Sequence, residues 1–282
     1  MSGNNTSIHC RNQIIRFNRP IVMGIINTTP DSFYDGGKFN EELAFIKRFE
    51  QMLDEGAMII DVGGASSRPG ASPLTTEEEI SRTIPFIRKA IEQFPNAIIS
   101  IDTYNSIVAQ EAVYAGASII NDISGGSLDE NMFSVVEKMK VPYILMHMKG
   151  TPQTMNSQNN YSDLKEDVYD YFSAKIKELN NRGIKDIILD PGFGFAKDIQ
   201  QNYDLLKNLN YFETLQLPIL VGVSRKSMIY KVLKTTPEQS LNGSTALNMI
   251  GLLNGASILR VHDVKEACET IQLYLQYNGT AL

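Results

Sequence analysis

The stretch from Ile98 to Asp122, IISIDTYNSIVAQEAVYAGASIIND, contains one complete structural unit of this chain. The apolar run Ile98–Ile101 predicts a buried strand, Ser106–Ala115 predicts a helix, and Ser118–Ile120 predicts a second strand. Gly116 stands just after the helix, where glycine takes the left-handed conformation that ends helices. Two strands joined through a helix in this way are parallel, and helices must then cover the sheet.

The same unit recurs along the chain. Six more apolar runs predict strands: Ile21–Ile26, Met58–Val62, Tyr143–Met146, Asp186–Leu189, Ile219–Val221 and Ser257–Val261. The other predicted helices are Glu41–Glu55, Thr76–Phe94, Asn131–Met139, Asp163–Asn181, Gln200–Thr214, Ser244–Leu253 and Val264–Gln276. Gly56, Gly183 and Gly255 repeat the position of Gly116. Eight such units in about 250 residues favour a closed (β/α)8 TIM barrel, an α/β fold, over an open doubly wound sheet.

We expect the barrel to form one domain that spans residues 1–282, because no linker, low-complexity tract or block of like charge interrupts it. Residues 1–18 precede the first strand, and we expect the segment His9–Phe17 to form a small hairpin that closes the base of the barrel. Thr75, followed three residues later by Glu78, predicts a capping box at the start of the second helix.

The composition limits the classes of partner. The net charge of −6 argues against a nucleic-acid ligand, because binding to a phosphate backbone needs a basic face. The apolar runs are strand-sized and far shorter than a membrane span, and the polar start, Met1–Ser7, lacks the apolar core of a signal peptide. Cys10 and Cys268 show no metal-type spacing. We therefore expect a cytoplasmic protein with two free thiols and no membrane partner.

Polar side chains gather where the predicted strands end. They are Asn27, Asp61, Asp102, Asn121, Asp122, His147, Asp190, the run Ser224–Lys226 and the run Arg260–Asp263. Because the carboxyl ends of all strands of a barrel share one face, these residues are expected to meet at one mouth, where barrels hold their active sites. A single Asp in such a position can simply cap the following helix, but that explanation does not cover the whole set.

The predicted mouth carries both signs of charge. The acidic side chains are Asp61, Asp102 and Asp190, and the basic ones are Arg68, Lys226, Arg260 and His262. Carboxylates suit a ligand rich in N–H donors, or one that becomes cationic during reaction. The basic side chains suit a phosphate or pyrophosphate. The sequence thus predicts a ligand with an amino-heterocycle at one end and a pyrophosphate at the other.

Two glycine-rich loops, Thr28–Gly37 and Gly63–Gly70, follow the first two strands. Such loops often close over a substrate, and the alternative is that they are ordinary surface loops. We expect His9 at the surface, whereas His147 is either a packed wall residue or a functional one. The histidines lie far apart, with no cysteine or carboxylate at zinc-ligand spacing.

Eight motifs make the chain similar to the dihydropteroate synthases. They are IVMGIINTTPDSFYDGG (21–37), DVGGASSRPGA (61–71), SIDT (100–103), IINDISGG (119–126), LMHMKGTP (145–152), DPGFGFAK (190–197), GVSRKS (222–227) and RVHDV (260–264). They cover nearly the whole barrel. Because two of them also occur in pterin-binding methyltransferases, the combination is what makes the resemblance specific.

The resemblance implies an enzyme that joins a dihydropterin pyrophosphate to p-aminobenzoate. Asp102, Asn121 and Asp190 would hydrogen-bond the ring nitrogens and the exocyclic amine of the pterin, and Asp61 is expected beside them among the substrate-binding residues. Lys226 would contact the pterin carbonyl and frame the p-aminobenzoate site. The pterin pocket would also be lined by Met146 and Gly222.

The remaining roles concern the leaving group and the second substrate. Asn27, Arg260 and His262 would bind the pyrophosphate, and Asn27 would reach a Mg²⁺ ion. The catalytic set implied by the resemblance is Asp102, Lys226, Asp35 and Arg68, the last two on the glycine-rich loops. The p-aminobenzoate site would be formed by Ser67, Pro69, Phe195, Lys226 and Ser227.

The resemblance also implies a homodimer that forms through the last helices. The chain departs from the family where Ala65 and Ser67 stand in place of the usual Glu and Thr, which puts the affinity for p-aminobenzoate and sulfonamides in doubt. One alternative is a methyltransferase domain that uses methyltetrahydrofolate, which has no need of the SSRPG and SRKS segments. A non-catalytic pterin-binding protein, the other alternative, would be expected to have lost Lys226 or Arg68.

Overall fold

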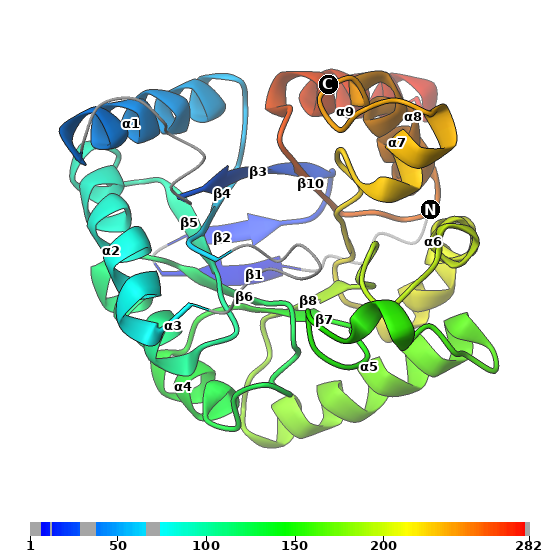
Figure 1. The fold of residues 1–282 in the computed structure, drawn as a ribbon, viewed down its shortest axis with the longest axis horizontal. Helices are drawn as coiled ribbons and strands as arrows, with labels where there is room; N and C mark the ends of the chain where they lie inside the picture. The colour runs from blue at the N-terminus through cyan, green and yellow to red at the C-terminus, as the bar shows by residue number, and fades with distance from the viewer. Residues whose placement is uncertain (1–6, 12, 29–37, 66–73, 280–282) are drawn as a thin grey trace.

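The computed structural model describes residues 7–11, 13–28, 38–65 and 74–279, which form a parallel β-barrel surrounded by helices (Figure 1). The barrel strands are β3 (Ile21–Asn27), β4 (Ile59–Gly63), β5 (Ile98–Asp102), β6 (Ile119–Asp122), β7 (Tyr143–Met146), β8 (Ile187–Asp190), β9 (Leu220–Val221) and β10 (Ile258–Val261). Around the barrel they follow the order β8-β7-β6-β5-β4-β3-β10-β9. The predicted (β/α)8 barrel is confirmed.

Helices cover the outer face of the strands on all sides (Figure 1). They are α1 (Lys38–Asp54), α2 (Thr76–Gln93), α3 (Ser106–Ala115), α4 (Met132–Met139), α5 (Leu164–Asn181), α6 (Ile199–Lys207), α7 (Ser227–Leu233), α8 (Leu241–Leu253) and α9 (Val264–Tyr277). The inner faces of these helices and the outer faces of the strands share one apolar cluster, in which Phe45, Phe49 and Ile60 are fully buried. Strands buried on both faces explain why the sequence shows continuous apolar runs instead of alternation.

The barrel closes between β8 and β9 through little hydrogen bonding. Leu189 and Ile219 form one parallel bridge, and the backbone N–H of Leu189 donates to the carbonyl of Pro218 at 2.9 Å. On its other side β9 pairs with β10 through Leu220 and Val221. We call this junction of β8 and β9 the seam.

An antiparallel hairpin formed by β1 (Ser7–Cys10) and β2 (Gln13–Arg16) precedes the barrel. Its buried side chains, Ile8, Cys10 and Ile15, pack against residues from the amino-terminal halves of the barrel strands. The partners are Ile21, Met23, Ile59, Ile98, Ile119, Ile144, Ile188, Leu220 and Ile258. The hairpin therefore covers the base of the barrel, opposite the carboxyl ends of the strands.

The predicted helix boundaries have clear local causes. Thr75 Oγ1 accepts the backbone N–H of Glu78 at 3.2 Å, and the Glu78 carboxylate accepts the N–H of Thr75 at 2.9 Å, which is the predicted capping box. The glycines that precede the strands adopt positive φ angles of 104° (Gly56), 130° (Gly116), 79° (Gly183) and 98° (Gly255). These angles explain why glycine is required at the turns into the strands.

The observed helices differ from the predicted ones in two places. The helix expected over Gln200–Thr214 ends at Lys207 and continues as a 3₁₀ helix, Leu209–Leu215. Between them, Asn208 is the C-cap residue of α6, and both its backbone N–H and its Nδ2 donate to the carbonyl of Asp204, at 3.1 and 2.7 Å. Helix α7 was not predicted, because two turns are too short to give a periodic apolar pattern.

Within the described part of the chain, no helix combines the length and apolarity needed to cross a membrane. Both cysteines are free thiols, as predicted: Cys10 is buried under the barrel and Cys268 is half-buried on α9.

Candidate active site

The predicted site residues that the structure describes lie at the carboxyl ends of the barrel strands. Those that end a strand are Asn27 (β3), Asp102 (β5), Met146 (β7) and Asp190 (β8). Those within a strand are Asp61 (β4), Asn121 (β6) and Arg260 (β10). Those on the loops that follow a strand, or at the start of the next helix, are Phe195, Gly222, Lys226, Ser227 and His262. The order of the strands places this set around one mouth.

Arg260 is the centre of the polar network. Its Nε donates to Asp61 Oδ2 at 2.7 Å, and its Nη2 donates to Asp102 Oδ2 at 2.6 Å. Asn121 Nδ2 donates to the same oxygen of Asp61 at 2.9 Å. Asp61 is fully buried, and its Oδ1 finds no hydrogen-bond partner among the described residues. Asp61 thus fixes the side chains of Asn121 and Arg260 from beneath.

The charges of this network are strongly coupled. Burial disfavours the charge of Arg260, but Asp61 and Asp102 outweigh burial and raise the pKa of the guanidinium above its usual value. Burial raises the pKa of Asp102 to about 7, a rise that Arg260 opposes and Asp61 increases. The pKa of Asp102 therefore stands above its usual range even with the Arg260 guanidinium beside it.

A second charged pair, Asp190 and Lys226, belongs to the other side of the mouth. Asp190 Oδ1 accepts the backbone N–H of Gly192 at 2.8 Å, and burial raises the pKa of Asp190 while Lys226 opposes the rise. Lys226 Nζ donates to the carbonyl of Phe193 and lies 4.9 Å from the centre of the Phe195 ring. Burial lowers the pKa of Lys226 to about 8, with Asp190 acting in the opposite direction.

The loop after β8 needs its glycines. Gly192 and Gly194 have φ angles of 75° and 80°. A Cβ on Gly192 would lie 2.0 Å from the carbonyl oxygen of His147, and one on Gly194 would lie 3.2 Å from Lys226 Cδ. The loop can approach both neighbours only because these two positions carry no side chain.

An apolar cluster, separate from the barrel core, borders the charged groups. It contains Ile123, Met146, Met148, Met155, Phe195 and Ala196, all buried. Gly222 lies beside the charged groups, since a Cβ there would be 3.8 Å from Lys226 Nζ and 3.9 Å from Arg260 Cβ. A flat heterocycle with polar edges finds apolar faces and charged partners here.

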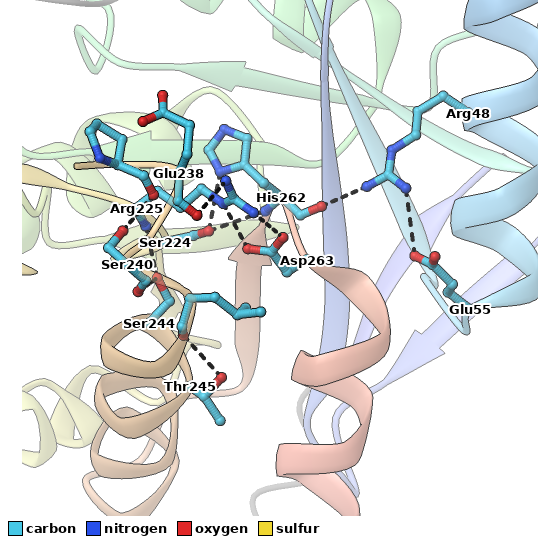
Figure 2. A network of polar contacts seen from close by, with 12 residues as sticks. Arg48, Glu55, Ser224, Arg225, Glu238, Ser240, Ser244, Thr245, His262 and Asp263 are labelled. Carbon is cyan, nitrogen blue, oxygen red and sulfur yellow. Dashed lines mark hydrogen bonds and ion pairs between the residues drawn. The ribbon is translucent and has the colours of Figure 1, made fainter. Parts of the chain in front are cut away.

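His262 is held from two sides. Its Nδ1 lies 3.1 Å from Ser224 Oγ, and the same hydroxyl oxygen accepts the backbone N–H of His262 at 3.2 Å. Arg48, from α1, donates to the carbonyl of His262 at 2.7 Å (Figure 2). Burial and the charge of Arg260 lower the pKa of His262 to about 4, so the imidazole is neutral at pH 7.

Arg225 joins the two loops that carry Lys226 and His262. Its guanidinium grips Asp263 with two bonds of 2.9 and 2.6 Å, and its backbone N–H donates to Ser244 Oγ at 2.9 Å (Figure 2). Arg225 has a φ of 56°, which is rare for a residue with a side chain. The ion pair and the bond from α8 hold this turn in place.

Asn27, the predicted Mg²⁺ ligand, is exposed at the end of β3. A Cβ built on Gly63 would lie 3.6 Å from Asn27 Oδ1 and 3.7 Å from Asp102 Oδ2, so both oxygens border the same edge. The described residues contain no group of three or more His, Cys, Asp or Glu that would hold a metal alone. Mg²⁺ often takes one protein oxygen together with waters and substrate phosphates, and Asn27 fits such a site.

Four predicted site residues, Asp35, Ser67, Arg68 and Pro69, lie outside the described residues, as do most of the two glycine-rich loops that carry them. Ser227 is the half-buried first residue of α7, next to Lys226.

Lys197 is a charged residue of this region that the sequence reasoning did not single out, although it ends the DPGFGFAK motif. Its Nζ lies 3.1 Å from His147 Nδ1, 3.1 Å from the carbonyl of Gly192 and 3.0 Å from that of Phe195. His147 is buried, and burial lowers its pKa well below the usual value, so it is a packed and hydrogen-bonded wall residue.

Asp122 has a different task from its neighbour Asn121. It accepts the backbone N–H groups of Ser124 and Gly126 at 2.7 and 2.8 Å and the hydroxyl of Tyr143 at 2.7 Å. It therefore shapes the loop after β6 and does not face the mouth.

The chain is similar to known proteins in both sequence and fold. The family profile described as "Pterin binding enzyme" matches residues 23–262. The dihydropteroate synthase of Escherichia coli K12 is 43% identical over 256 residues, 90% of each chain. That of Synechocystis is 45% identical over 250 residues, which cover 88% of this chain and 86% of the relative.

Solved structures agree. A Yersinia pestis dihydropteroate synthase, solved with a sulfonamide drug complex, superposes with a TM-score of 0.92 at 38% identity, covering 98% of this chain and 100% of the other. The Xanthomonas albilineans enzyme, in complex with 7,8-dihydropteroate, gives a TM-score of 0.88 at 32% identity, with coverage of 98% and 100%. Fold, strand-end residues and sequence together show that this chain belongs to the dihydropteroate synthases, a family of pterin-binding transferases.

Proposed function

We propose a division of labour among the mouth residues for the reaction of this family, in which 6-hydroxymethyl-7,8-dihydropterin pyrophosphate and p-aminobenzoate give 7,8-dihydropteroate and pyrophosphate. The observation that carries it is the shared guanidinium of Arg260. One cation lies between the carboxylates Asp61 and Asp102, while Asp190 and Lys226 form a second pair of opposite sign. Such a mouth offers acceptors to a pterin and cations to a pyrophosphate.

The pterin end is bound by Asp102, Asn121 and Asp190, which hydrogen-bond its ring nitrogens and exocyclic amine. The apolar cluster around Met146 and Phe195 lies against the ring faces. Asp61 acts through its neighbours, since it is fully buried and holds Asn121 and Arg260 in place. Lys226 contacts the pterin carbonyl.

The pyrophosphate end is bound by Arg260, His262 and Asn27. Arg260 keeps its charge at any physiological pH, and the neutral His262 donates a hydrogen bond to a phosphate oxygen. When bound beside Asn27, Mg²⁺ would supply further positive charge to the leaving group. These fixed positive charges lower the barrier most at the bridging oxygen that leaves, because negative charge develops there during the reaction.

The bond changes are simple. The C–O bond between the pterin methylene and the pyrophosphate breaks, and its electron pair leaves with the pyrophosphate. The carboxylates of Asp102 and Asp190 stabilise the positive pterin that remains. The amine of p-aminobenzoate forms the new C–N bond and then releases one proton; it needs no strong base, because an arylamine is neutral at pH 7.

The p-aminobenzoate site is formed by Lys226, Ser227 and Phe195 together with Ser67 and Pro69. The Phe195 ring, already beneath the ammonium of Lys226 at 4.9 Å, offers its remaining surface to the second aromatic ring. Asp35 and Arg68, on the two glycine-rich loops, close the site during reaction.

The protein forms a homodimer through its last helices and works in the cytoplasm. Large apolar side chains are exposed on α7, α8 and α9: Val232, Leu233, Ile250, Leu253, Leu273 and Tyr277. Apolar side chains gathered on neighbouring helices favour association. The two free thiols suit a reducing compartment.

A pyrophosphate-release assay with Mg²⁺ and the pterin substrate, with and without p-aminobenzoate, tests the proposal. Release that depends on p-aminobenzoate, together with the formation of dihydropteroate, is the expected result, and a sulfonamide should compete with p-aminobenzoate alone. Absence of product with intact substrates would refute the proposed roles.

A further inference from the structure

Lys197 uses all the protons of its ammonium group on the protein itself. A lysine ammonium has three N–H donors, and the three acceptors around Nζ are His147 Nδ1 and the carbonyls of Gly192 and Phe195, at 3.1, 3.1 and 3.0 Å. No donor remains for a substrate. The half-buried side chain instead bridges the end of β7 and both ends of the loop that follows β8.

That loop, residues 192–195, contacts both members of the second charged pair. The backbone N–H of Gly192 donates to Asp190, and the carbonyl of Phe193 accepts from Lys226. The ring of Phe195 lies beneath the Lys226 ammonium. The two carbonyls that Lys197 binds are the first and last of the same loop. A change in the loop would therefore move both Asp190 and Lys226.

The loop cannot hold its shape by local preference alone. Gly192, Gly194 and Ala196 all have positive φ, and for Ala196 the value is 49°, which residues with side chains rarely adopt. Tyr161 donates its hydroxyl to the carbonyl of Ala196 at 2.9 Å, Asn202 Oδ1 accepts the backbone N–H of Gly194 at 2.6 Å, and Lys197 donates to the carbonyls at both ends of the loop. The shape thus depends on side-chain bonds from outside the turn.

We propose that Lys197 is a positioning residue for the condensation, which clamps the 192–195 loop and thereby sets the geometry and charge of Asp190 and Lys226. This inference rests on the roles given to those two residues above. It assigns Lys197 no contact with either substrate.

The charge of Lys197 also reaches Asp190. Burial lowers the pKa of Lys197 to about 7; Asp190 opposes this, whereas Lys226 and Lys149 add to it. In return Lys197 lowers the pKa of Asp190. His147, with its pKa well below the usual value, stays neutral and keeps a lone pair for Lys197, and the centre of the Tyr161 ring lies 6.0 Å from that of the His147 ring.

The decisive variant is Lys197→Met, which keeps the length of the side chain and removes its donors and charge. Titration calorimetry with 6-hydroxymethyl-7,8-dihydropterin, a probe without phosphate, gives the pH dependence of pterin binding. The weakening of binding at low pH reports protonation of the two carboxyl groups that bind the pterin, Asp102 and Asp190. The part due to Asp190, whose pKa Lys197 helps to lower, should move up by about half a unit to one unit in the variant, a modest neighbouring-charge effect. Turnover should fall about tenfold or more, because the 192–195 loop no longer sets Lys226.

Two further variants separate positioning from folding. Lys149→Met is the matched control, because it removes a nearby positive charge that bonds Asn160 and Asp167 and lies over the Tyr161 ring without bonding residues 192–195. It should leave the binding profile in place. His147→Phe removes one of the three acceptors and should give a smaller shift in the same direction, even if Lys197→Met fails to fold.

An unchanged binding profile and turnover in both Lys197→Met and His147→Phe would overturn the inference. A shift as large in Lys149→Met would also overturn it, since any lost charge would then suffice. Failure of the wild-type protein to bind the pterin or to release pyrophosphate would instead count against the proposed function itself.

Discussion

Replacing Asp102 by Asn should stabilise the fold and slow the reaction. Burial raises the pKa of Asp102 to about 7. The charge of Arg260 opposes this rise, and the charge of Asp61 increases it. Between the ordinary carboxyl pKa near ~4 and pH 7, the folded state binds more protons at this position than the unfolded chain, so stability falls as pH rises through this window. Above pH 7 the penalty is complete, and Asn removes it.

The size of the gain follows from the shift. Each pKa unit corresponds to ~1.4 kcal/mol, so a rise of about three units bounds the gain at about 4 kcal/mol. About half of that is expected, because Asn leaves Arg260 with one charged partner fewer at 2.6 Å. With an unfolding entropy of ~2.1 cal/mol/K per residue over 282 residues, about 2 kcal/mol raises Tm by about 3 °C at pH 8.

Thermal unfolding by circular dichroism at pH 5 and pH 8 measures this, beside kcat from pyrophosphate release. Asp102→Asn should raise Tm at pH 8 and raise it little at pH 5. Its kcat should fall about tenfold or more, while its affinity for the pterin changes less. Asp129→Asn is the control of opposite sign. Burial raises the pKa of Asp129, but hydrogen bonds from Ser106 and Asn131 outweigh burial and lower it, so removing this carboxylate should destabilise the protein at pH 8. Equal Tm for the Asp102 variant and wild type at both pH values would refute the linkage argument, and equal losses in affinity and kcat would refute the assignment of its charge to the cationic step.

Asp61→Ala should destabilise the protein by about 3 kcal/mol in urea titration and abolish most activity, because it leaves the amide of Asn121 without its acceptor and Arg260 with one carboxylate instead of two. Thr75→Ala, which removes the capping bond to Glu78, should cost ~1 kcal/mol in the same titration with kcat unchanged, and a loss of kcat would link the start of α2 to the site. The activity that depends on charged Lys226 should fall as pH rises through about 8. Lys226→Arg should remove this fall from the kcat/KM profile even if its overall rate is low, because arginine keeps its charge. If the fall near pH 8 remains in the variant, another group causes it.

The sequence predicted the barrel well because its signals are local. Apolar runs buried on both faces mark the strands, and glycines with positive φ, such as Gly116, mark the turns into them. The short helix α7 was missed because two turns carry no period. The helix expected over Gln200–Thr214 was misjudged because Asn208 caps α6, with its backbone N–H and its side chain on the carbonyl of Asp204, and the chain continues as a 3₁₀ helix.

The sequence was enough to predict which residues form the site, but it was less able to predict the contacts among them. Strand-end polar residues converge by the geometry of a barrel, so the sequence alone was enough to group Asp102 with Arg260. No pattern in the sequence indicates that Asp61 is fully buried beneath them. Lys197 was missed for the same reason: its three acceptors come from positions 147, 192 and 195, and only the fold brings the first of these to the other two.

The seam between β8 and β9 gives the substrate a mechanical role. Asp190 ends one bordering strand, and Lys226 follows the other after a short turn, so the barrel's closing junction, a single bridge, runs beneath the two residues to which we assign the pterin. A pterin bound as proposed would span this junction and add its own bonds to the closure. Opening of this junction would then also loosen the hold on the product. In relatives adapted to high temperature, a tighter seam would hold the product longer, so heat tolerance and rapid turnover would be set against each other at this one junction.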